Sequence, residues 1–175
     1  MSSSRKTTAA TRVQYAALPY RINGRERPEV MLVTSRQSRR WIIPKGWPHK
    51  GQAPYRSAAR EAFEEAGVIG AIRRRPVGSF LYEKRLKKGR AVECVVRVFA
   101  LKVKRQNQEW PEKAERRVKW LSVRAAADAV REPTLRQIIL RLARTSGRRK
   151  LATGSLARRH YGKVVKSEPP VRPKV

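Results

Sequence analysis

Three glutamates, Glu61, Glu64 and Glu65, lie within five residues of a chain whose formal net charge is +30. In an α-helix, positions three or four residues apart share a face, so we expect these carboxylates to lie side by side. Like charges at this spacing weaken a helix by roughly 0.2–0.5 kcal/mol per pair. Hard divalent cations such as Mg²⁺ bind carboxylate oxygens and would relieve the repulsion. The cluster therefore predicts a metal site.

The element that must position these glutamates is a helix predicted over residues 54–66. Pro54 suits the first turn of a helix, and Gly67 suits the position just past its end. Small side chains repeat every fourth residue along the segment, which would let the helix lie close to a sheet. These are Ala58, Ala62 and Ala66. The loop that leads into the helix, residues 44–54, is rich in glycine and proline.

The segments on both sides of this helix predict a sheet and two further helices. Apolar runs bounded by turn residues predict strands. The runs are 13–22, 30–34, 41–43, 72–84, 91–103 and 118–121, and a turn at 87–90 should join two of them as a hairpin. Ser122 suits the N-cap of a helix over 123–130, and a last helix begins at Pro133. The mixture predicts an α/β (α+β) fold.

Length and charge predict one domain with basic extensions. The 175 residues suit a single domain, which we place at 11–143, after a disordered leader at 1–10 and before a disordered basic tail at 144–175. Ten Lys or Arg residues and one acid fall in that tail, so the rest of the chain still has a charge of +21. Such a field attracts polyanions, which include phosphorylated small molecules, nucleic acid and anionic membrane surfaces.

Several classes of protein are excluded by composition. The single cysteine, Cys94, lies in an apolar run and is expected to be a buried thiol, so a disulfide framework or a cysteine-based zinc site is excluded. No apolar stretch approaches the roughly 20 residues that span a bilayer. The Ser/Arg-rich start faintly resembles an organelle transit peptide, but a cytoplasmic protein with a short leader is the preferred interpretation.

Residues 60–68, with Gly46, resemble the signature of the Nudix hydrolase family. That signature is Gly, five residues, Glu, seven residues, then Arg-Glu-aliphatic-x-Glu-Glu-x-Gly-aliphatic. Gly46 takes the first position, and the segment from Arg60 to Val68 fits if Ala62 counts as the aliphatic residue. One position departs, because Gln52 stands where the signature has its first glutamate. Glutamine keeps the hydrogen-bonding capacity of that residue but loses its charge.

The resemblance implies a Nudix-type α/β/α sandwich, with a mixed sheet and the signature loop and helix. It also implies Mg²⁺-dependent hydrolysis of a pyrophosphate linkage, with Mn²⁺ as a substitute. Glu64, Glu65 and the Gly46 carbonyl are expected to bind the metal. Glu61 is expected to be either a further ligand or the base that activates water. Arg60 should orient carboxylates rather than contact the substrate.

Residues outside the signature complete the predicted site. Members of the family often use one more acid, and the polar loop before Trp120 offers Glu109, Glu112 and Glu115. Each of these alone is more simply a solvated loop side chain; Glu112 or Glu115 is favoured if one serves. Cations around the signature are candidates for binding substrate phosphates. They are Arg36, Arg39, Arg40, Lys45 and Lys50. His49 is expected to be a solvated loop histidine.

The stretch from Trp41 to Gly51 looks closest to the diphosphoinositol-polyphosphate and diadenosine-polyphosphate phosphohydrolases of the family. The expected substrate is therefore a highly anionic phosphorylated small molecule. Two alternatives stay open. One is a Nudix enzyme that acts on RNA 5′ ends, with nucleic acid held by the basic tail. The other is a binding module that lost catalysis with the change at Gln52. The sequence does not predict an oligomeric state.

Overall fold

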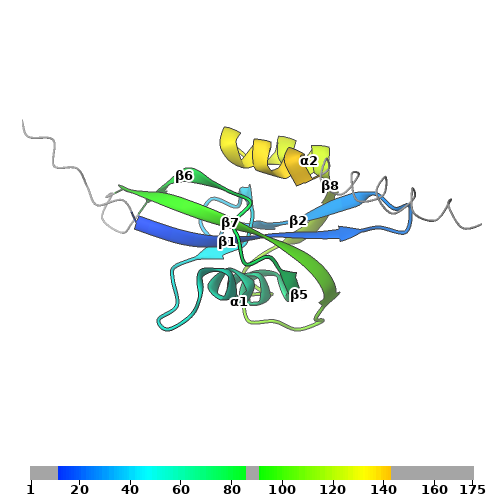
Figure 1. The fold of residues 1–175 in the computed structure, drawn as a ribbon, viewed down its shortest axis with the longest axis horizontal. Coiled ribbons are helices and arrows are strands. Elements are labelled where there is room, and N and C mark those ends of the chain that lie inside the picture. Colours follow the sequence, from blue (N-terminus) through cyan, green and yellow to red (C-terminus); the bar gives the residue numbers. More distant parts are fainter. Residues whose placement is uncertain (1–11, 86–90, 143–175) are drawn as a thin grey trace, which may run out of the picture.

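A mixed sheet of eight strands forms the centre of the computed structural model, which describes residues 12–85 and 91–142 (Figure 1). The strands are β1 Arg12–Ile22, β2 Pro28–Thr34, β3 Trp41–Ile42, β4 Lys45–Gly46, β5 Val68–Ile72, β6 Gly78–Arg85, β7 Ala91–Gln106 and β8 Val118–Ser122. The main path of the sheet runs β3-β2-β1-β7-β5. Strands β1 and β7 are parallel, and the other pairs are antiparallel. The predicted hairpin between the segments before and after residue 90 is confirmed by the pairing of β6 with β7.

Helices cover both faces of the sheet, as the predicted α/β/α sandwich requires. Helix α1, Pro54–Ala66, lies against one face, and α2, Val123–Ala129, lies against the other with a helix at residues 133–142 (Figure 1). The alternation of side chains along a strand supplies both cores. In β1, Ala17 packs in the core under α1, whereas Ala16 and Leu18 pack in the core under the other two helices.

The predicted bounds of α1 are confirmed at both ends. Pro54 stands in the first turn, and Gly67 ends the helix with a φ of 68°, a left-handed conformation that glycine adopts without strain. A Cβ at Gly67 would also collide with the Trp110 ring. The small side chains of the helix are fully buried against the sheet; they are Ala58, Ala62 and Ala66. This stripe fixes which side of α1 faces the sheet.

Two predicted segments differ from the structure. The strand expected over 72–84 begins only at Gly78, as β6, and residues 73–77 lie outside any strand. Ile72 is instead the last residue of β5, whose residues 68–71 were not predicted as a strand, and both β5 and β6 pair with β7. Pro76 lies in the break, where its missing N–H costs the sheet no hydrogen bond. The loop expected over 44–54 begins with β4, whose Gly46 pairs with Tyr15 of β1. A strand of two residues is too short to show any periodicity.

Other predictions are confirmed or lie outside the described residues. Ser122 caps α2 by accepting a hydrogen bond from the Ala125 N–H at 3.2 Å, and Cys94 is buried. None of the described helices has the length and apolar character needed to cross a membrane. The leader at 1–10, the turn at 87–90 and the tail at 144–175 are not among the described residues.

Candidate active site

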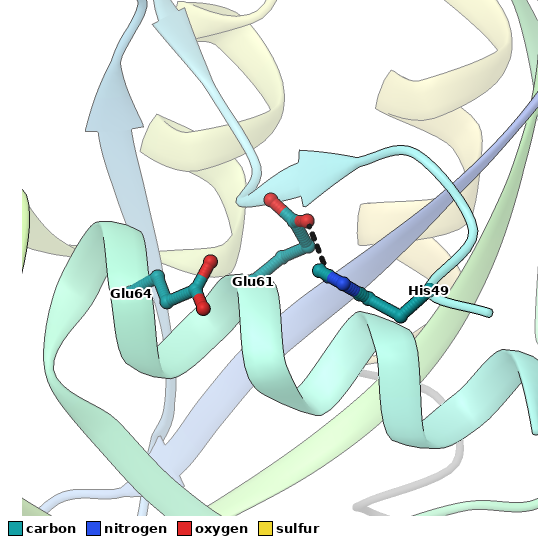
Figure 2. A group of neighbouring side chains, drawn as sticks. All are labelled: His49, Glu61 and Glu64. Carbon is teal, nitrogen blue, oxygen red and sulfur yellow. Dashed lines mark hydrogen bonds and ion pairs between the residues drawn. The ribbon is translucent and has the colours of Figure 1, made fainter. Parts of the chain in front are cut away.

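Helix α1 and strand β4 bring the first part of the site together. Glu61 and Glu64 project from the same side of α1, and His49 reaches Glu61 from the loop between β4 and α1 (Figure 2). The Nε2 atom of His49 lies 3.1 Å from Oε1 of Glu61. One ligand atom from each of the three residues lies within 4.8 Å of the others. The helical spacing predicted from the sequence is therefore confirmed for this pair of glutamates.

Gly46 lets the Glu61 carboxylate approach the backbone of β4. A Cβ at this position would overlap the carboxylate group of Glu61. Every other residue type has a Cβ, so the signature glycine is required by this close approach. The pairing of β4 with β1 holds the backbone of Gly46 in place. Glu61 is consequently enclosed, with a side chain only 12% exposed.

Glu65 points into a different environment, where Arg116 is its partner. The two side chains form an ion pair, and each is only 5% exposed. The backbone N–H of Lys45 also donates to Glu65, at 3.4 Å. Burial raises the pKa of Glu65 to about 7, although the charge of Arg116 acts in the opposite direction. Burial likewise raises the pKa of Glu61, against the hydrogen bond from His49.

Arg116 joins three elements around the site. Its Nε donates to Glu112 at 2.5 Å, and its Nη1 donates to the Thr34 carbonyl at 2.9 Å. Its Nη2 donates to the carboxylate of Glu65. The loop between β7 and β8 is thereby tied to β2 and to α1. The backbone N–H of Glu112 also donates to the carbonyl of Glu64, at 3.0 Å. Glu112 thus lies beside the glutamates of α1.

The three acids of this loop differ in position. Glu115 is 53% exposed and pairs with Arg36 at 3.4 Å, and Glu109 is 82% exposed and pairs with Lys113 at 2.5 Å. Glu112 is only 21% exposed. Its negative charge contributes to the raised pKa of both Glu61 and Glu65. Between the two acids favoured from the sequence, the structure brings only Glu112 to the α1 carboxylates.

A cleft of about 620 Å³ opens beside Glu65 and Arg116. The loop after β2, strand β6 and the segment before the last helix form its walls. The charged lining residues are Arg36, Arg40, Lys45, Glu65, Glu83, Arg116, Arg131 and Glu132. Tyr82 is the aromatic residue in this lining, and its ring centroid lies 4.1 Å from Nζ of Lys45 and 5.0 Å from Cζ of Arg40.

The cations predicted to bind substrate divide into two groups. Arg36, Arg40 and Lys45 line the cleft. Arg39 instead donates to the Glu115 carbonyl at 2.7 Å, and the exposed Lys50 lies in the turn before α1; neither is among the lining residues. Arg60 pairs with Glu64 at 2.6 Å, which agrees with a role in orienting carboxylates.

Sequence reasoning missed or misplaced three residues of this site. His49 was expected to be a solvated loop side chain, but it is only 26% exposed and contacts Glu61. His49 lies three residues after the signature glycine, in an irregular loop. Such a loop has no helical or strand periodicity from which the contact could be inferred. Arg116 and Arg131 had no distinguishing signal among the 43 Lys and Arg residues of the chain. Gln52, where the signature has glutamate, is exposed in the turn before α1.

The residues present fit a divalent cation. Carboxylate oxygens are ligands for Mg²⁺ and Mn²⁺, and imidazole nitrogen is a ligand for many divalent metals. Glu61, Glu64 and His49 place such atoms close together, and the lack of a Cβ at Gly46 leaves the room that the Glu61 carboxylate uses. The donor set therefore supports a metal on this side of α1.

Comparison with known proteins agrees with the fold and the signature. The model of the NUDIX domain matches residues 11–142. Nudix hydrolase 12, mitochondrial, of Arabidopsis thaliana is 35% identical over 108 residues, which are 59% of this chain and 52% of that protein. Nudix hydrolase 4 of the same plant is 28% identical over 138 residues, which are 75% of this chain and 65% of that protein. The chain thus spans between about half and two thirds of the length of these relatives.

Solved structures share the fold at low sequence identity. A binary complex of the Ap4A hydrolase of C. elegans has a TM-score of 0.58 and 20% identity, covering 82% of this chain and 99% of that one. The dihydroneopterin triphosphate pyrophosphohydrolase of E. coli has a TM-score of 0.59 and 19% identity, covering 76% and 95% of the two chains. At these identities the likeness establishes the fold. The names of several relatives include mitochondrial or chloroplastic, so a cytoplasmic location stays a prediction.

Proposed function

The chain belongs to the Nudix family, and from that premise we propose that it hydrolyses a pyrophosphate linkage in a highly anionic phosphorylated small molecule. The reaction adds water across a P–O–P bridge. The water oxygen bonds to one phosphorus, the bond from that phosphorus to the bridging oxygen breaks, and two phosphate products form. A divalent metal, when bound, supplies positive charge for the phosphate oxygens and lowers the pKa of water.

The α1 carboxylates are assigned by their surroundings. Glu64 would hold the metal together with the Gly46 carbonyl, and Arg60 holds Glu64 through its 2.6 Å ion pair. Glu65 needs its negative charge to join them, and Arg116 favours that charged form. Glu112 is the further acid, because it lies beside the α1 carboxylates, where its ion pair with Arg116 at 2.5 Å holds it. Glu61 remains either a ligand or the base that takes the proton from water.

The single observation that supports the substrate class is the charge of the cleft. Five of its lining residues are cationic and three are acidic. Two of those acids are paired with cations of the same lining, Glu65 with Arg116 and Glu132 with Arg40. Cations in a cleft attract phosphates, and arginine binds them through paired N–H groups. The aromatic residue of the lining, Tyr82, already has the cations of Lys45 and Arg40 close to its ring. The lining favours a phosphate-rich substrate, of the diphosphoinositol polyphosphate type, over a base-bearing one.

A panel of substrates tests this proposal. Diphosphoinositol polyphosphates, dinucleoside polyphosphates, ADP-ribose, nucleoside triphosphates and 5′-triphosphorylated RNA are incubated with the full chain and Mg²⁺, and phosphate release is measured. We expect the diphosphoinositol compounds to have the highest kcat/KM and the dinucleoside polyphosphates the next. A preference for RNA that disappears when the chain is truncated after Arg144 would instead support the RNA alternative. No turnover of any member, with tight binding of one, would support a binding module.

A further inference from the structure

We infer that His49 is a ligand of the divalent metal, so that the site binds its ion through mixed nitrogen and oxygen atoms. The family signature has no residue for this role, and the loop between β4 and α1 supplies it here. The inference rests on the proposed function only in taking the α1 glutamates as ligands of a metal. It concerns which atoms hold the ion and which ions the site prefers.

The position of the imidazole supports this assignment. Nε2 of His49 lies 3.1 Å from Oε1 of Glu61, on the side of α1 that also presents Glu64 (Figure 2). Ligand atoms from the three residues are all within 4.8 Å of one another. Two ligands on opposite sides of one Mg²⁺ ion are about 4 Å apart, at 2.0–2.1 Å each. Small rotations of the side chains would therefore bring the three atoms around one ion.

The loop backbone holds His49 in this position without a metal. Its N–H donates to the hydroxyl of Ser57 at 3.3 Å, and its carbonyl accepts from the Gln52 N–H at 3.1 Å. Ser57 is fully buried in the first turns of α1. The side chain of His49 is only 26% exposed. Fixing the loop backbone before binding lowers the entropy cost of forming the site.

This arrangement also gives a role to the departure at Gln52. The signature glutamate would have brought a fourth negative charge to the segment, and Gln52 does not. His49 adds a neutral ligand instead, which binds metal without further repulsion between carboxylates. A nitrogen ligand shifts preference from Mg²⁺ toward ions such as Co²⁺, which bind imidazole more strongly.

Electron spin echo envelope modulation with Mn²⁺ alone tests the inference. The technique detects nitrogen-14 directly bound to the ion. The chain has two histidines, His49 and His160, so the protein is prepared without a histidine tag and in excess over the metal. We expect the nitrogen signal in the wild type and in His160→Gln, and its loss in His49→Gln. Glutamine can still donate a hydrogen bond to Glu61 but offers no imidazole nitrogen.

The outcomes distinguish failure of the His49 assignment from failure of the proposed function. Binding of Mn²⁺ with no nitrogen signal in the His160→Gln protein would overturn the inference and leave His49 as a hydrogen-bond partner of Glu61. No binding of Mn²⁺ at all would overturn the proposed function as well. As a second readout, His49→Gln should lower the ratio of Co²⁺ affinity to Mg²⁺ affinity by about tenfold, whereas His160→Gln should leave that ratio unchanged. An unchanged ratio in His49→Gln would contradict a nitrogen ligand.

Discussion

Arg116 and Glu65 form a buried ion pair between the loop after β7 and the signature helix, with each side chain only 5% exposed. Both residues also line the cationic cleft. The charge of Arg116 lowers the pKa of Glu65, but burial outweighs it and raises that pKa to about 7. The pair also anchors the loop after β7 to the signature helix. The position of Glu112, which lies in that loop, therefore depends on the helix.

Removing Arg116 should therefore be costly. We expect Arg116→Met to lower the free energy of unfolding by about 3 kcal/mol at pH 8, because it leaves the buried Glu65 carboxylate without a compensating positive charge from Arg116. Denaturant unfolding in the presence of a chelator measures this. Arg36→Met is the matched control, since Arg36 is 58% exposed and its pairs with Glu112 and Glu115 are worth less than about 1 kcal/mol. Equal losses in the two variants would contradict a structural role for the buried pair.

The raised pKa of Glu65 predicts how the stability of the metal-free protein varies with pH. A carboxyl with a pKa of about 7 in the folded state and 4.5 when unfolded stabilises the fold through its protonated form. This contribution is complete below pH 4.5 and is lost as the pH rises through about 7. It amounts to at most about 3 kcal/mol.

Comparison with Glu65→Gln separates the contribution of Glu65 to the free energy of unfolding from the contributions of the other titrating groups. Glutamine resembles the protonated carboxyl at every pH, so the variant should lose less stability than the wild type between pH 5 and pH 8. Unfolding free energies across that range, measured with a chelator present, check the prediction. Parallel curves for the two proteins would show that Glu65 does not titrate in this window.

The cations of the cleft and of the neighbouring turn should differ in their effect on substrate binding. Lys45→Gln should raise KM roughly tenfold with little change in kcat, because a hydrogen bond to a charged group contributes about 1.5 kcal/mol or more. Lys50→Gln removes the same charge from an exposed position that is not in the described cleft lining, and KM should change little. Steady-state kinetics of phosphate release measures both. The same change in KM for both variants would indicate a general electrostatic effect.

Restoring the signature glutamate should have a small effect. Gln52 is exposed in the turn before α1, and the structure gives its side chain no hydrogen bond within the described residues. We expect Gln52→Glu to change the Mg²⁺ affinity by less than about fivefold, the range of a solvent-screened charge. Isothermal titration with Mg²⁺ gives the answer. A gain of a hundredfold would show that the missing charge limits metal binding in the natural chain.

The sequence predicted the parts of this site that repeat with a regular period or belong to a motif. The shared face of Glu61 and Glu64 and the stripe beginning at Ala58 follow from helical spacing, and both are confirmed. Contacts made across the fold were not predictable in the same way. Arg116 reaches Glu65 from 51 residues away, and His49 reaches Glu61 through the path of an irregular loop. Such pairs depend on how the helices, strands and loops pack together, and this packing cannot be predicted from a local sequence pattern.

Phosphate release by Glu64→Gln, compared with wild type and with Glu109→Gln, tests the central claim most directly. Both variants remove one negative charge, but Glu109 is 82% exposed and pairs only with Lys113 among the described residues. With Mg²⁺ and a diphosphoinositol polyphosphate, we expect Glu64→Gln to lose at least about 100-fold in kcat/KM while its circular dichroism spectrum is unchanged. Glu109→Gln should keep the wild-type rate. Wild-type activity in Glu64→Gln would contradict the assignment of the metal site and of the reaction to helix α1.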